Sequence, residues 1–173
     1  MTGAFTIRPE GAADADAVRA VTTVAFGRPD EARIVERLRE RARIYLGVVA
    51  TGGEAVIGHI LFTSVPLRGD ESSHTIMALA PMSVLPAWQR RGVGSALVRA
   101  GLRACRDAGH DVAVVVGHPD YYPRFGFVRA SPLGLTSELP FPDEAFMVAE
   151  LTPGALRGRA GVVVYGEEFD AGH

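Results

Sequence analysis

The feature that most constrains the fold is a run of apolar residues, Val112–Val116, that comes directly after an amphipathic helix pattern. The run does not alternate between apolar and polar residues, which is typical of a parallel strand buried on both faces. The helix pattern covers residues 92–108 and ends at Gly109, and a strand-like run over residues 75–84 precedes it. This order of strand, helix and strand predicts two parallel strands joined by a helical crossover.

The other elements are shorter and are separated by turns. Two helix patterns lie near the N-terminus: the first is capped by Asp14 or Asp16 and runs to Phe26, and the second begins at Asp30. The remaining strand patterns cover residues 5–8, 45–51, 55–65, 146–151 and 161–165. We therefore expect one α/β domain over residues 1–173, built on a mixed sheet.

Composition excludes several classes of protein. The 173 residues include 18 basic and 20 acidic side chains, for a formal net charge of −2. The chain thus lacks the excess positive charge that non-specific nucleic-acid binders use. Every basic residue is arginine, which excludes a P-loop or Schiff-base lysine. The single cysteine, Cys105, excludes an intrachain disulfide, and the histidines show no metal-ligand spacing, so we expect no metal.

The sequence shows no membrane or export signal. No apolar stretch approaches the ~18 residues that a transmembrane helix needs. The N-terminal residues lack the basic region and apolar centre of a signal peptide. We therefore expect a cytoplasmic protein with no membrane partner.

A glycine-bearing turn opens the crossover helix. The first N–H groups of a helix have no intrahelical acceptor, and the helix dipole adds partial positive charge, so this position favours an anion. Gly92 and Gly94 leave room for a phosphate, and Arg90 and Arg91 add positive charge. The turn is not GxxxxGK[ST], which needs a lysine, and it is not GxGxxG, because Leu97 replaces the third glycine.

The strand, the turn and the helix together resemble the GNAT acetyltransferase superfamily. The pyrophosphate loop of that family reads (Gln/Arg)-x-x-Gly-x-(Gly/Ala), and residues 89–94, Gln-Arg-Arg-Gly-Val-Gly, are similar to it. The resemblance covers about residues 5–128 and implies a mixed, mostly antiparallel sheet with a central parallel strand pair, flanked by helices. It implies acetyl-CoA as co-substrate, with its diphosphate on the backbone amides of the turn and its pantetheine arm on the preceding strand end. The cofactor-binding residues that it implies are Met82, Ser83, Val84, Gln89, Arg90, Arg91, Gly92, Val93, Gly94 and Ser95.

A second cluster follows the buried strand, at the end where open α/β sheets bind ligands. Residues 122–127, Tyr-Pro-Arg-Phe-Gly-Phe, resemble the Tyr-x-x-x-Gly-Phe motif of the same family and of its YhbS-like branch. The resemblance makes Tyr122 the candidate acid that protonates the CoA thiolate, since a phenol with a pKa of about 10 keeps its proton at neutral pH. The alternative is that Tyr122 only packs beneath the cofactor. Tyr121 is expected to face the other way and to be structural.

The general base is less clearly marked. Residues 75–84 contain no acid, although several members of the family carry a glutamate there. His118 lies beside Tyr122, and histidine is the side chain whose ordinary pKa lies nearest to neutral pH, so it is one candidate. Glu150, on a later strand that could reach the cleft, and His59, in the middle of a strand, are the others. A water chain is the alternative, because holding amine and thioester together supplies much of the acceleration.

The expected function is transfer of an acetyl group to a primary amine by direct attack in a ternary complex. The acceptor is a small-molecule amine or a protein N-terminus, and Phe26 and residues 132–142 are candidate walls of its pocket. The alternative is a non-catalytic acyl-CoA-binding sensor or regulatory protein, which the missing strand carboxylate favours. Homodimers are common in the family, and the sequence is compatible with one.

Overall fold

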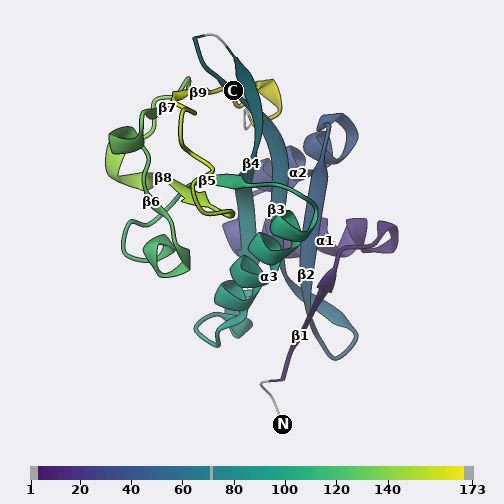
Figure 1. The fold of residues 1–173 in the computed structure, drawn as a ribbon. Helices are drawn as coiled ribbons and strands as arrows, with labels where there is room; N and C mark the ends of the chain where they lie inside the picture. The colour runs from purple at the N-terminus through teal and green to yellow at the C-terminus, as the bar shows by residue number, and fades with distance from the viewer. Residues whose placement is uncertain (1–3, 71, 170–173) are drawn as a thin grey trace.

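The structure is a computed structural model that describes residues 4–70 and 72–169, and in this part of the chain nine strands form one sheet (Figure 1). The order along the sheet is β1-β2-β3-β4-β5-β8-β6, and β9 pairs with both β3 and β7. The strands are Thr6–Pro9 (β1), Tyr45–Gly52 (β2), Ala55–Arg68 (β3), Ser73–Val84 (β4), Val112–Val116 (β5), Val128–Arg129 (β6), Leu135–Ser137 (β7), Phe146–Glu150 (β8) and Gly161–Val163 (β9). The α-helices are Ala15–Phe26 (α1), Asp30–Arg41 (α2) and Val93–Asp107 (α3).

β2, β3 and β4 form an antiparallel meander, and β1 pairs antiparallel with β2 at its edge. β2 and β3 are joined by a tight turn in which Gly53 has a φ of 63°, a conformation that favours glycine. This confirms the hairpin that the sequence predicts at Gly52 and Gly53.

The crossover through α3 brings β4 and β5 side by side as parallel strands, with Leu79 opposite Val115. This confirms the parallel pair predicted from Val112–Val116. At Gly101 the helix approaches the sheet so closely that a Cβ would overlap the ring of Phe62. The missing side chain therefore allows α3 to lie directly on the sheet.

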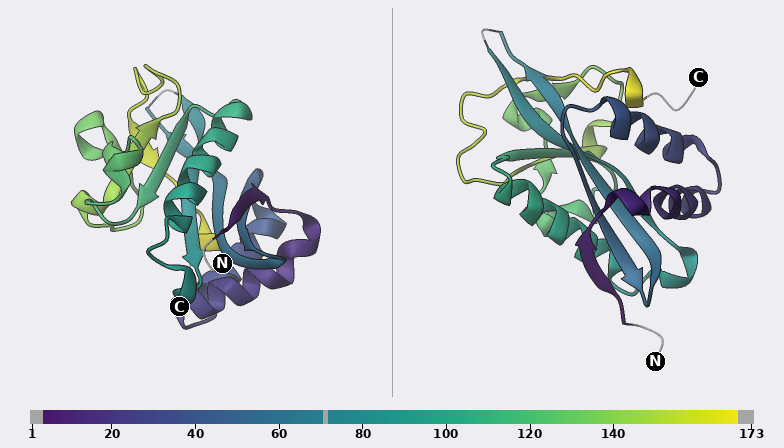
Figure 2. Two further views of the ribbon diagram at one scale, coloured as in Figure 1. Left: turned by 90° about the horizontal axis from the view of Figure 1, so that it is seen from below. Right: turned by 90° about the vertical axis from the view of Figure 1, so that its right-hand side faces the viewer.

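The two faces of the sheet are covered by different parts of the chain (Figure 2). On one face α3 packs against Met77 and Leu79 of β4. Ile76 and Ala78 point to the other face, because successive strand residues alternate, and there the segment 130–169 covers β4, β5 and β8. On that same face α1 and α2 cover β2 and β3, around Leu61. The N-terminal helices and the C-terminal segment thus lie opposite α3.

Of the two expected caps, Asp14 or Asp16, the structure places Asp14 at the N-cap position of α1, but its side chain makes no capping hydrogen bond there. The carboxylate of Asp14 accepts hydrogen bonds from Arg8 at 2.7 and 2.9 Å and from the N–H of Gly11 at 2.7 Å. These donors lower the pKa of Asp14 to about 2. Asp14 therefore fastens β1 to the turn before α1 and makes no side-chain hydrogen bond to the start of that helix.

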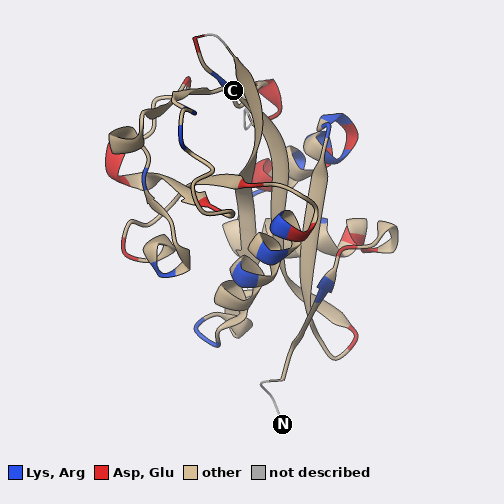
Figure 3. Ribbon diagram, viewed as in Figure 1, with Lys and Arg blue, Asp and Glu red and all other residues tan. Residues whose placement is uncertain are grey.

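The arginines of α3 lie along its exposed side (Figure 3). Arg106 donates a hydrogen bond to the carbonyl of Leu151 at 2.9 Å, and Arg99 stacks over the ring of Phe125 at 5.1 Å. These arginines therefore help to hold neighbouring loops. No helix in the described residues is long and apolar enough to cross a membrane. The same residues contain no group of three His, Cys, Asp or Glu side chains able to hold a metal ion.

Candidate functional site

The pairing of β4 with β5 ends before β4 itself does. Val115 of β5 is last matched with Leu79, whereas β4 continues along β3 to Val84. A β-bulge lies at this point, because Ala80 and Pro81 of β4 take the space of one residue in β3. A bulge bends its strand, and the backbone groups of β4 that face β5 have no partner strand beyond it. We call this gap the β4–β5 opening; such a free edge is able to bind an extended ligand through its main chain.

The glycine turn lies between the end of β4 and the start of α3. Gly92, just before the helix, has a φ of 83°, and a Cβ on it would have no heavy atom within 4 Å. Arg90 is held at a φ of 63°, a strained conformation for a residue other than glycine, and such strain is common at functional loops. Gln89 fastens the turn by donating from Nε2 to the carbonyl of Val84 at 3.0 Å. Open space, unpartnered helix N–H groups and two arginines together fit a diphosphate.

Trp88 supports this turn on the side of the β2–β3 hairpin. Its ring lies against Gly52 of the β2–β3 hairpin, where any Cβ would collide with it. The guanidinium of Arg91 lies over the same ring, 5.4 Å from its centre. Trp88 thus anchors the turn against the hairpin.

The tyrosine cluster follows β5, in a short 3₁₀ turn over Tyr122–Phe125. The ring of Tyr122 lies directly against Gly117 and is buried on the α3 side of the sheet. Burial, together with the neighbouring Tyr121, raises the pKa of Tyr122 to about 12. A phenol in this state keeps its proton throughout the physiological range.

Tyr121 occupies a position that the sequence does not predict. Its hydroxyl lies 3.1 Å from that of Ser95, in the first turn of α3. It also lies 3.4 Å from the place where a Cβ on Gly94 would stand. Tyr121 therefore reaches the proposed cofactor turn, whereas the sequence motif draws attention only to its neighbour.

The three candidate bases, His118, Glu150 and His59, lie in different parts of the structure. His118 is exposed, and its carbonyl accepts the N–H groups of Tyr121 and Tyr122 at 3.1 and 3.3 Å. Glu150 pairs with Val112 at the start of β5, whereas the β4–β5 opening lies at the end of that strand. The expectation that its strand would carry Glu150 to the cleft is therefore wrong, and its carboxylate instead accepts the N–H of Leu156 at 2.8 Å.

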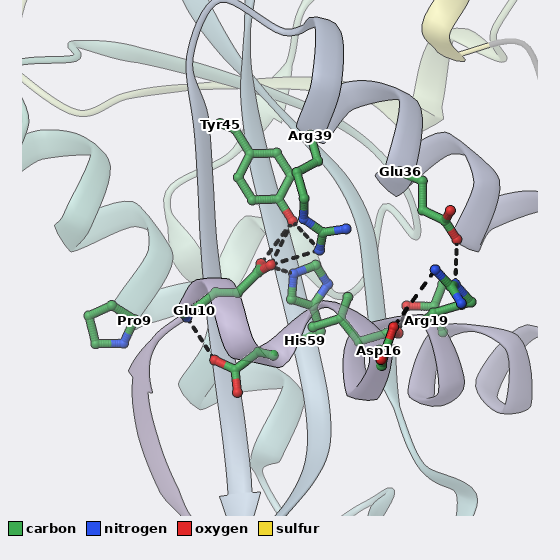
Figure 4. A network of polar contacts seen from close by, with 12 residues as sticks. Pro9, Glu10, Asp16, Arg19, Glu36, Arg39, Tyr45 and His59 are labelled. Carbon is green, nitrogen blue, oxygen red and sulfur yellow. Dashed lines mark hydrogen bonds and ion pairs between the residues drawn. The ribbon is translucent and has the colours of Figure 1, made fainter.

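His59 belongs to a separate buried cluster on the α1–α2 face (Figure 4). Its Nε2 lies 2.8 Å from the carboxylate of Glu10, which also binds Arg39 and the hydroxyl of Tyr45. The side chain of His59 is fully buried. It is thus a member of a structural network between β1, β2, β3 and α2.

A cavity of about 270 Å³ lies beside the β4–β5 opening on the face opposite α3. Its walls come from the α1–α2 turn, from the strands at the opening and from the C-terminal segment. We call it the aromatic cavity; it is lined by Phe26, Glu31, Ile34, Leu79, Ala80, Pro81, Val116, Leu139, Phe141, Tyr165 and Phe169.

The structure brings the expected wall residues to this cavity and adds others. Phe26 lines it, and so do Leu139 and Phe141 from the predicted wall segment 132–142. Tyr165 and Phe169 were not predicted, because only the fold of the tail brings them to the α1–α2 turn. No short-range pattern in the sequence marks them.

Comparison with known proteins identifies the family. The family described as Acetyltransferase (GNAT) domain matches residues 6–130. The chain is 38% identical to the N-acetyltransferase YjhQ of Escherichia coli K12, over 89% of this chain and 90% of YjhQ. It is 34% identical to the N-acetyltransferase YhbS of the same organism, over 95% of this chain and 98% of YhbS.

Solved structures agree with this assignment. The E. coli YhbS structure in complex with CoA superimposes with a TM-score of 0.88 at 32% identity, covering 96% of this chain and 92% of that one. A GNAT acetyltransferase from Brucella melitensis in complex with acetyl-CoA gives a TM-score of 0.78 at 33% identity, covering 97% and 99% of the two chains. The mixed sheet, the glycine turn before α3 and these matches lead to one conclusion: the chain belongs to the GNAT family and is an N-acetyltransferase that uses acetyl-CoA as co-substrate.

Proposed function

We propose that the protein acetylates a primary amine that binds in the aromatic cavity, by direct attack in a ternary complex. The observation that carries this proposal is the β4–β5 opening. Leu79 and Val116 border it, and both also line the aromatic cavity on the face opposite α3. Acetyl-CoA held near the start of α3 and an amine held in the aromatic cavity would therefore meet at the β4–β5 opening.

The same geometry supports a proposal for the residues that hold acetyl-CoA. The free edge of β4 presents the main chain of Met82 and Val84 to the pantetheine amides. The first turn of α3, from Val93 to Ser95, presents its N–H groups to the diphosphate, with Arg90 and Arg91 beside it. Acetyl-CoA supplies the thioester whose carbonyl carbon the amine attacks.

Tyr122 is the proposed acid. As the amine nitrogen bonds to the carbonyl carbon, the carbon–sulfur bond breaks and the sulfur takes the proton of the Tyr122 hydroxyl. The raised pKa of Tyr122, about 12, ensures that this proton is present before the reaction. The phenolate regains a proton from solvent afterwards.

The proton of the acceptor amine leaves by one of two routes. His118 lies at the end of β5, two residues beyond Val116 of the cavity wall, and is exposed to solvent. It takes the proton directly, or water at the same edge does. A His118→Gln variant separates the routes: a loss of the acidic limb from the pH profile of kcat supports His118, and an unchanged profile supports water.

Replacing Tyr122 by Phe tests the acid role. We expect kcat, measured as CoA thiol release with a panel of primary amines, to fall by about 100-fold or more. The affinity for acetyl-CoA, measured by calorimetry, should stay close to that of the unmodified protein, because the ring remains in place. Tyr121→Phe is the comparison variant: it removes the neighbouring hydroxyl, which lies 3.1 Å from that of Ser95 in the proposed cofactor turn. Any loss should then be in the affinity for acetyl-CoA, and kcat at saturating acetyl-CoA should stay within about threefold.

Two results would contradict the proposal in different ways. An unchanged kcat in Tyr122→Phe would remove Tyr122 from the chemistry while leaving the acetyl transfer intact. Tight acetyl-CoA binding without turnover of any amine would contradict the proposal that the acceptor is a primary amine.

A further inference from the structure

The walls of the aromatic cavity are apolar and already assembled. Phe141 and Tyr165 meet edge to face with ring centres 5.4 Å apart, and Tyr165 and Phe169 do so at 5.1 Å. Rings that already pack against one another have less rotamer freedom to lose when a ligand binds. Such a surface favours a ligand with apolar area, because burying that area is the main source of affinity.

The cavity offers no free charge to a ligand. Glu31 is the only ionised residue among the described residues that line it. Its two carboxylate oxygens are bound by Arg28, from Nε at 3.0 Å and from Nη2 at 2.6 Å. The Arg28 guanidinium also lowers the pKa of Glu31, so this carboxylate stays ionised and paired. A second ammonium group on the ligand would therefore be desolvated without a partner.

One polar group remains in the wall. The hydroxyl of Tyr165 has no hydrogen bond to another described residue, and burial raises the pKa of this phenol, so it is neutral. It is able to hydrogen-bond a single amine nitrogen. An apolar cavity also favours the neutral amine over the ammonium form, which lessens the need for a carboxylate on β4.

The volume of the cavity also favours a small ligand, and its walls combine two parts of the chain. Its volume of about 270 Å³ lies just below the ~300–1,000 Å³ of pockets for drug-sized ligands. Leu139, Phe141, Tyr165 and Phe169 all come from beyond residue 130, where the match to the family ends. These four residues supply three of the aromatic rings in the walls, so part of the wall chemistry comes from outside the residues that the family description matches.

From these observations we infer that the acceptor is a small monoamine with an aliphatic or aromatic body, and that the aromatic cavity rejects amines that carry a second charge. This inference rests on the proposed function, because it takes the cavity as the acceptor site.

A matched pair of amines tests the inference. n-Hexylamine and 1,5-diaminopentane have the same number of non-hydrogen atoms and differ only in a terminal methyl against an ammonium group. We expect kcat/KM, measured as CoA thiol release, to be about 100-fold or more higher for n-hexylamine, because the second ammonium loses its hydration. Along the series from n-propylamine to n-hexylamine, kcat/KM should rise about fourfold per methylene. 2-Phenylethylamine should be at least as good a substrate as n-hexylamine.

A charge placed in the wall should reverse the preference. Leu139→Glu adds a carboxylate without a partner to the cavity, and Leu139→Gln adds a side chain of the same size without the charge. We expect the ratio of kcat/KM for the two amines to fall at least about tenfold further in Leu139→Glu than in Leu139→Gln. Leu133→Glu, on an exposed leucine outside the cavity, adds the same charge and should leave the ratio unchanged.

The outcomes separate the inference from the proposed function. Turnover of 1,5-diaminopentane equal to or above that of n-hexylamine would overturn the inference and leave amine acetylation standing. So would a peptide with N-terminal Phe that is used better than both n-hexylamine and 2-phenylethylamine. Binding of acetyl-CoA without turnover of any amine would overturn both.

Discussion

Glu10 shows how one buried carboxylate joins four elements of this fold. Its side chain is only 5% exposed, and it accepts hydrogen bonds from His59, Tyr45 and Arg39, each at 2.8 Å (Figure 4). Burial alone would raise the pKa of Glu10, but these donors outweigh it and hold the pKa below its usual value. The charged form is therefore the one that the folded protein stabilises.

Replacing Glu10 by Gln should lower the free energy of unfolding by about 2–3 kcal/mol at pH 7, because Arg39 then lacks its buried counter-charge. For a chain of this length the midpoint temperature falls by about 5–10 °C. Thermal unfolding followed by circular dichroism measures this. Glu36→Gln breaks an exposed pair with Arg19 and should stay within about 0.5 kcal/mol. Equal losses in the two variants would contradict the role of the buried cluster.

The same carboxylate makes stability depend on pH in a definite direction. Because the pKa of Glu10 is lower in the folded state than its ordinary value of 4.5, its contribution is present above that value. The contribution is lost as the pH falls through the folded-state pKa. Unfolding midpoints measured below pH 4.5 should thus converge for the unmodified protein and Glu10→Gln. A constant difference down to pH 2 would show that the charge of Glu10 is not involved.

Among the elements, the start of α3 carries the proposed anion site. Gly92→Glu places bulk and negative charge next to its N–H groups, so the affinity for acetyl-CoA should fall about 100-fold or more in calorimetry. Gly109→Glu is the matched control just beyond the other end of α3: this glycine also has a positive φ, 92°, and open space around its Cβ position. It carries the same backbone strain and should bind acetyl-CoA normally. Equal weakening in both variants would point to loss of folding instead.

The elements with a clear sequence period could be predicted, and those that depend on distant partners could not. The five apolar residues of β5 and the apolar stripe of α3 follow local rules, so both were expected within one or two residues. β7 is only three residues long and was not expected. A strand of that length has too few residues to show alternation. β9 was expected over residues 161–165, but its parallel pairing with β7 depends on where the tail folds back.

The candidate site also has parts that local sequence predicts and parts that depend on tertiary contacts. The glycine turn is a continuous stretch, so its place before α3 was predictable from the sequence alone. The bulge at Ala80 and Pro81 depends on the register with β3, and the position of Glu150 depends on which end of β5 it faces. The aromatic cavity joins Phe26 to Tyr165 across most of the chain. Tertiary contacts decide these features, and local patterns do not record them.

For the molecule as a whole, acetyl-CoA should act as a structural ligand. At 100 times its Kd, a ligand that binds only the folded state adds about 2.7 kcal/mol, which for this length raises the unfolding midpoint by about 5–10 °C. Hydrogen exchange should slow along the free edge of β4 and in the first turn of α3. Pantetheine, which has no diphosphate, should protect β4 but not α3. Equal protection of α3 by both ligands would contradict the placement of the diphosphate there.

The arrangement of the two binding regions also governs the order of events during turnover. The proposed diphosphate site lies at the start of α3, and the residues that line the aromatic cavity pack on the opposite face of the sheet. For the proposed reaction we therefore expect each substrate to bind, and each product to leave, whether the other position is filled or empty. Steady-state kinetics should then follow a random sequential scheme, in which free CoA competes with acetyl-CoA but not with the amine. The β4–β5 opening is thus the place where two substrates that bind from opposite faces of the sheet meet.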